Sequence, residues 1–176
     1  MAVPVEGQLS VGGFTAVTSA RFTRPADTTA YAANDVVSNS DATTELLVFR
    51  NCVREPGGSG QLVSGIMFAS TDAATNPNFD LLLFDTSAVT VAADNAASTV
   101  TDTEVLNLVA SITFDGTNAA NVSTAGANLI IGATAIGQGF KCAPGSVDLY
   151  GLVVARAAYT PASAENFNFK LAISQD

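Results

Sequence analysis

Carboxylates are the only side chains in this chain whose types could support hydrolytic catalysis. The sequence has no histidine, which excludes Ser-His and Cys-His nucleophilic pairs as well as imidazole ligands for zinc. Two carboxylates suffice for a glycosidase, and Asp80 and Asp85 flank one expected strand. Their odd separation places them on opposite faces of a regular strand. We therefore expect both to contact turns or solvent, and we predict that the protein is not an enzyme.

Oxygen-rich loops are the other place where chemistry could occur. Asp94 and Asp115 lie among asparagines and glycines, and hard cations such as Ca²⁺ prefer oxygen ligands. However, no Asp-x-Asp-x-Asp-Gly spacing is present, so these residues are more simply turn formers. We expect no metal and no cofactor.

The charge balance excludes several classes of partner. The net charge is −9, with 7 basic residues against 16 acidic ones, so no basic stripe is available for nucleic acid or for a membrane surface. No apolar run reaches the ~20 residues of a membrane span, and the first residues do not resemble a secretion signal. Only 13% of residues are charged, which favours a surface that assembly covers.

The two cysteines, Cys52 and Cys142, are isolated in the sequence. A disulfide between them is arithmetically allowed. Without a secretion signal, we expect reduced, buried thiols instead.

Alternation and turn residues predict an all-β fold, an antiparallel β-sandwich of the jelly-roll-like type. We expect an N-terminal arm over 1–12 and a single sandwich domain over 13–176. The glycine-rich stretch 56–60 predicts a hairpin loop. Thr101 and Glu104 have capping-box spacing, and the apolar residues after them predict one short helix near 102–110. The expected strands are 13–23, 31–37, 45–54, 61–70, 79–85, 89–92, 128–133, 137–142, 147–157 and 165–173.

Two of these strands carry distinct patterns. The last one alternates cleanly, with Phe167, Phe169, Leu171 and Ile173 on one face and polar residues on the other, which predicts one dry and one wet side. Residues 149–155 are apolar on both faces. We expect either another segment or a neighbouring subunit to cover the second face.

The stretch from Phe22 to Val37 predicts a sharply specified corner. Pro25 pushes Arg24 towards an extended conformation, the Asp and Thr residues that follow favour a turn, and Tyr31 supplies an aromatic anchor with a polar tip. Arg24 and Tyr31 are therefore candidates for an assembly interface.

Arg50 and Arg54 are the other candidate interface residues. They lie an even number of positions apart in one expected strand, so they can share a face. They fit a solvated edge, an ion pair with Glu45 or Glu55, or an anchor on an acidic neighbouring subunit.

Three segments carry a resemblance to a known family. They are Arg24-Pro25-Ala26-Asp27-Thr28-Thr29-Ala30-Tyr31 with Asp35-Val36-Val37, the insert Asp102–Val109, and Tyr159-Thr160-Pro161-Ala162-Ser163. Together they resemble jelly-roll capsid cement or decoration proteins of tailed bacteriophages. The resemblance implies a homotrimer on the capsid exterior of the virion, bound to the major capsid protein and stabilising contacts between its copies.

Two other function classes remain open. Jelly rolls also serve as lectins, so the alternative is a receptor- or carbohydrate-binding module of a tail fibre or spike. Its candidate platforms are Tyr31, Tyr150 and Tyr159, since tryptophan is absent. A carboxylate-based glycan hydrolase is the least favoured of the function classes.

Overall fold

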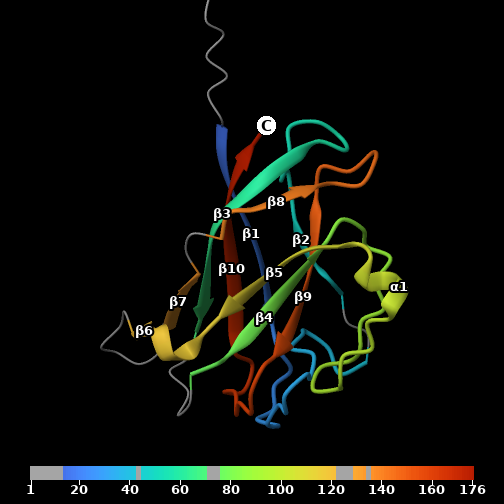
Figure 1. Ribbon diagram of the computed structural model, residues 1–176. Coiled ribbons are helices and arrows are strands. Elements are labelled where there is room, and N and C mark those ends of the chain that lie inside the picture. Colours follow the sequence, from blue (N-terminus) through green and yellow to red (C-terminus); the bar gives the residue numbers. More distant parts are fainter. Residues whose placement is uncertain (1–13, 43–44, 71–75, 122–128, 134–135) are drawn as a thin grey trace, which may run out of the picture.

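The computed structural model describes residues 14–42, 45–70, 76–121, 129–133 and 136–176, which form two antiparallel sheets packed face to face (Figure 1). The first sheet has the strand order β1-β10-β3-β7-β6, with β8 also paired to β3. The second has the order β2-β9-β4-β5. This confirms the predicted all-β sandwich. The expected arm over 1–12 lies outside the described residues, and the single-domain division stays a prediction.

The elements have the following bounds: β1 Phe14–Thr23, β2 Leu47–Phe49, β3 Ser59–Ala69, β4 Phe79–Phe84, α1 Asp102–Val105, β5 Leu108–Phe114, a 3-10 turn Gly116–Asn118, β6 Ala120–Asn121, β7 Leu129–Ala133, β8 Gln138–Lys141, β9 Leu149–Ala155 and β10 Asn166–Gln175.

Strand β10 lies between β1 and β3 in the first sheet. Its register with β1 runs from Phe14 opposite Gln175 to Thr23 opposite Asn166. The predicted alternation is confirmed, because the four apolar residues of β10 are fully buried. One of them, Phe167, meets Phe79 of the second sheet edge to face with ring centroids 5.2 Å apart. Such aromatic contacts join the two layers.

The outer face of β9 is covered by the protein's own chain. Leu152 and Val154 pack there in a second apolar cluster with Val36, Phe84 and Val89. In Figure 1 the segments that follow β4 and precede β5 run alongside this sheet. Of the two alternatives for the doubly apolar strand, cover by another segment of the same chain is the one observed.

Several expected strands are shorter or absent. Residues 31–37 form only isolated bridges, in which Tyr31 pairs with Tyr159 and Val36 with Val154. Residues 89–92 form no strand, since they pack as a cover on β9 rather than extend a sheet. The expected strand 45–54 is reduced to β2. The prediction of a hairpin loop at 56–60 is also wrong, because β2 and β3 belong to different sheets and this stretch leads from one sheet to the other.

The helix is confirmed but ends earlier than predicted. Thr101 and Glu104 form the capping box, yet α1 stops at Val105 and β5 begins at Leu108. Ala110, Ile112 and Phe114 are buried at every second position, so the two-residue period determined the structure beyond Val105.

Candidate functional site

The predicted corner is built around a buried arginine at one end of the sandwich. Arg24 follows β1 directly and is 2% exposed. Its Nε donates to the Tyr31 hydroxyl at 2.9 Å, and its Nη1 donates to the backbone oxygen of Asp27 at 2.6 Å. Its Nη2 reaches carboxylate oxygens of Asp27 and Asp94, each at 3.2 Å. A planar guanidinium with five donors suits such a multiply bonded position.

Asp94 is the carboxylate that compensates this buried charge. Its Oδ1 accepts from the Tyr31 hydroxyl and from the backbone N–H of Ser38, both at 2.7 Å. Its Oδ2 faces Arg24. Burial raises the pKa of Asp94, while the Ser38 and Tyr31 hydrogen bonds and the charge of Arg24 act in the opposite direction. Both oxygens of Asp94 therefore have protein partners.

A second buried carboxylate lies behind the corner. The rings of Tyr31 and Tyr159 stack with centroids 6.4 Å apart, and the Tyr159 hydroxyl donates to Glu165 Oε2 at 2.6 Å. Glu165 is fully buried, and its Oε1 has no hydrogen-bond partner among the described residues. Burial raises the pKa of both tyrosines. The two tyrosines thus link the corner after β1 to the loop before β10.

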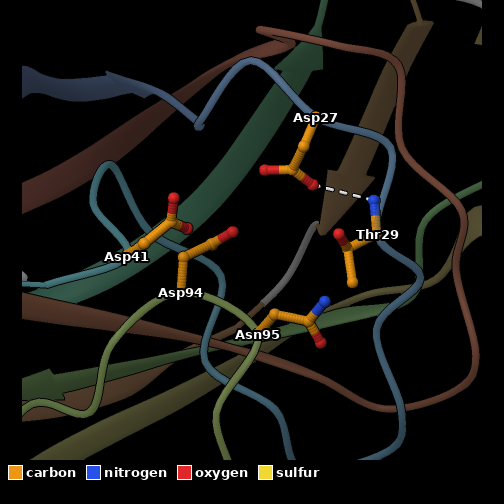
Figure 2. Close-up of a pocket in the computed structure, with 5 residues that line it drawn as sticks. All are labelled: Asp27, Thr29, Asp41, Asp94 and Asn95. Atoms are coloured by element: carbon orange, nitrogen blue, oxygen red, sulfur yellow. Dashed lines mark hydrogen bonds between the residues drawn. The ribbon is translucent and has the colours of Figure 1, made fainter.

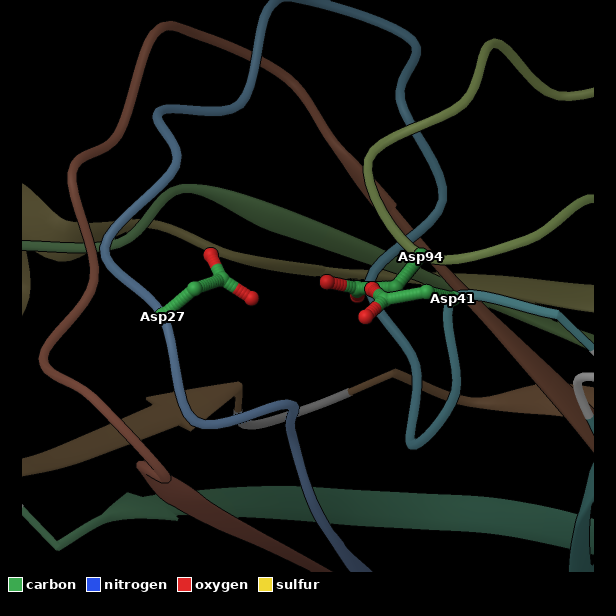
Figure 3. Close-up of side chains that lie close together, drawn as sticks. All are labelled: Asp27, Asp41 and Asp94. Carbon is green, nitrogen blue, oxygen red and sulfur yellow. The ribbon is translucent and has the colours of Figure 1, made fainter.

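Three aspartates line a surface hollow next to the corner formed by Arg24 and Tyr31. The hollow has a volume of about 510 Å³ and is lined by Asp27, Asp41, Asp94, Thr29 and Asn95. Figure 2 shows these five side chains. One oxygen from each carboxylate lies within 4.8 Å of the others (Figure 3). Oxygens so arranged have the chemistry that a hard cation prefers.

The protein itself already provides donors for most of this cluster. Asp94 is held as described above, and Asp27 Oδ1 accepts from the backbone N–H of Thr29 at 2.8 Å, a contact that lowers the pKa of Asp27. Asp41, in contrast, is exposed. Because Arg24 neutralises the buried part of the cluster, we interpret the arrangement as a structural ionic network.

The structure brings two of the four predicted interface residues together, whereas Arg50 and Arg54 both lie past the end of β2 and do not share one strand. Arg24 and Tyr31 contact each other and are buried within the chain. Arg50 lies after the end of β2 and is exposed, 3.7 Å from Asp148, which replaces the expected partner Glu45 or Glu55. Arg54 lies 5.5 Å above the ring of Phe14. An interface role for these residues stays a prediction.

Most of the remaining candidates have structural partners. Arg156 binds Asp80 at 3.0 Å, whereas Asp85, just past the end of β4, has a buried Oδ1 without a hydrogen-bond partner among the described residues. Cys52 and Cys142 are buried free thiols, as predicted, and burial raises their pKa values to about 12 and about 11.

Sequence reasoning missed the role of Asp94. It was expected to be a turn residue, and its partner Arg24 is 70 positions away. No spacing rule connects such distant residues. The one sequence feature that pointed to a buried ion pair was Arg24, an arginine directly before Pro25 in a chain with few basic residues.

The helices of the described ranges include none with the length and apolarity that a membrane crossing requires.

Comparisons with known proteins give only distant likenesses. No protein-family model matches the chain, and no curated protein matches it either. Among solved structures, a chain of the cyanophage Pam1 capsid asymmetric unit is 14% identical with a TM-score of 0.33, over 100% of this chain and 93% of that one. A chain of sacbrood virus of honeybee is 14% identical with a TM-score of 0.31, over 93% and 70%. The K3 adhesin domain of Lys-gingipain from Porphyromonas gingivalis is 8% identical with a TM-score of 0.28, over 79% and 71%. Likenesses this weak carry no functional argument.

Proposed function

We propose that this chain is a structural virion protein of the capsid cement or decoration type. The observation that carries the proposal is the corner itself. Two of the three segments that resemble phage decoration proteins, Arg24–Tyr31 and Tyr159–Ser163, lie far apart in the sequence. They pair through the Tyr31–Tyr159 bridge and ring stack. The resembling residues therefore form one packed unit that holds loops in place.

The polar chemistry of this unit supports a role without catalysis. Arg24, Asp94 and Tyr159 each have hydrogen-bond partners within the protein. The chain has no histidine to serve as a base near neutral pH. A buried hydrogen-bonded network rigidifies loops, and rigid loops suit a component that binds a fixed lattice.

Under this proposal the partner is the major capsid protein, bound at the capsid exterior by a homotrimer. Arg50 and Arg54 are the candidate anchors between copies, since both are outside the buried network. Individual contacts can be modest, because three linked copies raise the effective concentration of each further contact.

The test is the copy number of the chain in purified virions, measured by quantitative mass spectrometry against the major capsid protein. A cement protein is expected in numbers comparable to that protein. Absence from intact virions, together with a monomeric state in solution, would refute the proposal.

A tail-fibre or spike module that binds carbohydrate is the second candidate. Tyr150 is partly exposed and lines a hollow of about 300 Å³ with Glu45 and Ser87, whereas Tyr31 and Tyr159 are buried. Aromatic rings next to polar groups suit sugar recognition. A glycan array with the wild-type protein and a Tyr150→Ala variant separates the candidates, and a copy number far below that of the capsid protein would favour this one.

A further inference from the structure

The first sheet differs from the rest of the protein in its charge. None of the 16 acidic residues of the chain lies in the six strands that the structure describes in this sheet. The same strands carry Arg21, Lys141 and Lys170. With a net charge of −9 for the chain and +3 for these strands, the remainder sums to −12. The sheet is therefore a basic face on a strongly acidic protein.

The outer face of this sheet also exposes several apolar side chains. Val17 is 70% exposed, Val63 41% and Ile66 36%. The register places Phe68 beside Ile130 of β7 on the same face, and both are partly exposed. In the second sheet, by contrast, the protein's own segments cover the outer face of β9. A mixed apolar and basic sheet face of this kind is typical of a binding surface.

The two central basic residues of this face form no ion pair with a described residue, although Arg21 lines a surface hollow together with Glu45. Arg21 is opposite Asn168 and Lys170 is opposite Ser19, which makes the two charges diagonal neighbours. Among the described residues, neither takes part in an ion pair, and the Lys170 ammonium lies 5.2 Å above the ring of Phe68.

The third basic residue has an acidic neighbour. Lys141 is opposite Ser59, whose hydroxyl donates to Asp176 at the rim. The positive charge without an ion-pair partner among the described residues is therefore concentrated on Arg21 and Lys170.

We propose that the outer face of the first sheet, centred on Arg21, Lys170 and Ile66, docks onto an acidic and partly apolar surface of the capsid shell. The inference rests on the proposed virion function and names the surface that serves it. Charge complementarity is the argument: Arg21 and Lys170 need acidic partners, and the apolar side chains around them exclude water from such pairs.

A second copy of this chain fits the face less well. A two-fold contact through this sheet would bring Arg21 and Lys170 of one copy against those of the other. A head-to-tail contact would pair Arg21 and Lys170 with acidic loops of the next copy. The outer face of the first sheet would then not be free to bind the shell. The shell protein is therefore the occupant that we assign.

The test compares rebinding of purified protein to particles produced without this chain. The perturbing variant is Arg21→Gln with Lys170→Gln. The matched control is Thr99→Glu with Thr103→Glu, which shifts the net charge by the same amount at exposed residues away from the sheet. We expect the first variant to bind about tenfold more weakly or worse and to lose most of its salt sensitivity. The control should bind within about twofold of the wild type.

A second measurement uses only the wild-type protein. The chain has two lysines, so acetylation by an amine reagent followed by mass spectrometry reports on both. We expect Lys170 to be protected in shell-bound protein and reactive in free protein.

The outcomes separate this inference from the proposed function. If the wild type binds and the sheet variant binds equally well, with Lys170 still reactive, the docking face is wrong and the virion role stands. If the wild type does not bind the particles, the virion role itself fails. If the variant loses self-association without any shell present, the face joins copies of this chain and the shell assignment is overturned.

Discussion

Replacing Asp94 with alanine should destabilise the protein more than any other single change in the acidic cluster. The change removes the acceptor of three donors: the Arg24 guanidinium, the Tyr31 hydroxyl and the backbone N–H of Ser38. The side chains of Arg24 and Asp94 are 0% and 1% exposed, so this ion pair is shielded from water in the native protein. Breaking a buried ion pair from one side costs about 3–5 kcal/mol.

That loss is large against the ~5–15 kcal/mol by which domains are stable. For a chain of this size it corresponds to a fall in Tm of roughly 6–20 °C. The assay is urea unfolding followed by circular dichroism, with thermal unfolding as a second measure.

Asp41→Ala is the matched control for this prediction. Asp41 belongs to the same cluster but is exposed, so its removal should change stability by less than about 0.5 kcal/mol. A cycle with Arg24→Ala should show a double variant less destabilised than the sum of the two single ones. An Asp94→Ala cost below about 1 kcal/mol, or equal costs at Asp41 and Asp94, would refute the reasoning.

Three further predictions follow from the same structure. Backbone hydrogen bonds lower the pKa of Glu104 to about 2. The contribution of its carboxylate to stability is therefore complete above about pH 4.5 and disappears as the pH falls towards 2. Urea titrations at several pH values should show this loss in the wild type but not in a Glu104→Gln variant. A Cβ on Gly151 would lie 2.9 Å from two core side chains, so Gly151→Ala should lower the free energy of unfolding by about 1–3 kcal/mol. A Cβ on Gly132 would meet nothing within 4 Å, so Gly132→Ala is the control and should change that free energy almost not at all. Thermal unfolding of both variants measures the difference. Burial and raised pKa values should make Cys52 and Cys142 unreactive towards a thiol reagent until the protein unfolds, and rapid labelling of the native protein would contradict this.

The strands with a clean two-residue period could be predicted from the sequence. Strand β10 is the best example, because its four large apolar residues face the core, and a polar side chain is buried only at its last residue, Gln175. The segment after Thr101 could not be predicted as well. Val105, Leu108 and Ile112 fit a helical period, whereas the observed strand follows from pairing with β4, which only the tertiary structure specifies.

The site was predictable only as a corner. Pro25 and the residues around it indicated a turn, and Tyr31 was expected to anchor it. The buried partner Asp94 and the stacking partner Tyr159 are distant in sequence. Their pairing depends on how the two sheets bring loops to one end of the sandwich, and no local pattern encodes that.

The place of β10 in the sheet has a consequence for how the protein forms during synthesis. Because β10 lies between β1 and β3, the ribosome produces both neighbours long before the strand that joins them. Until β10 emerges, β1 has no partner within the described sheet, and one edge of β3 stays open. Such unpaired edges invite pairing with other nascent chains. Crowded expression at high temperature should therefore favour aggregation before completion of the chain, even though the finished sandwich has these edges paired.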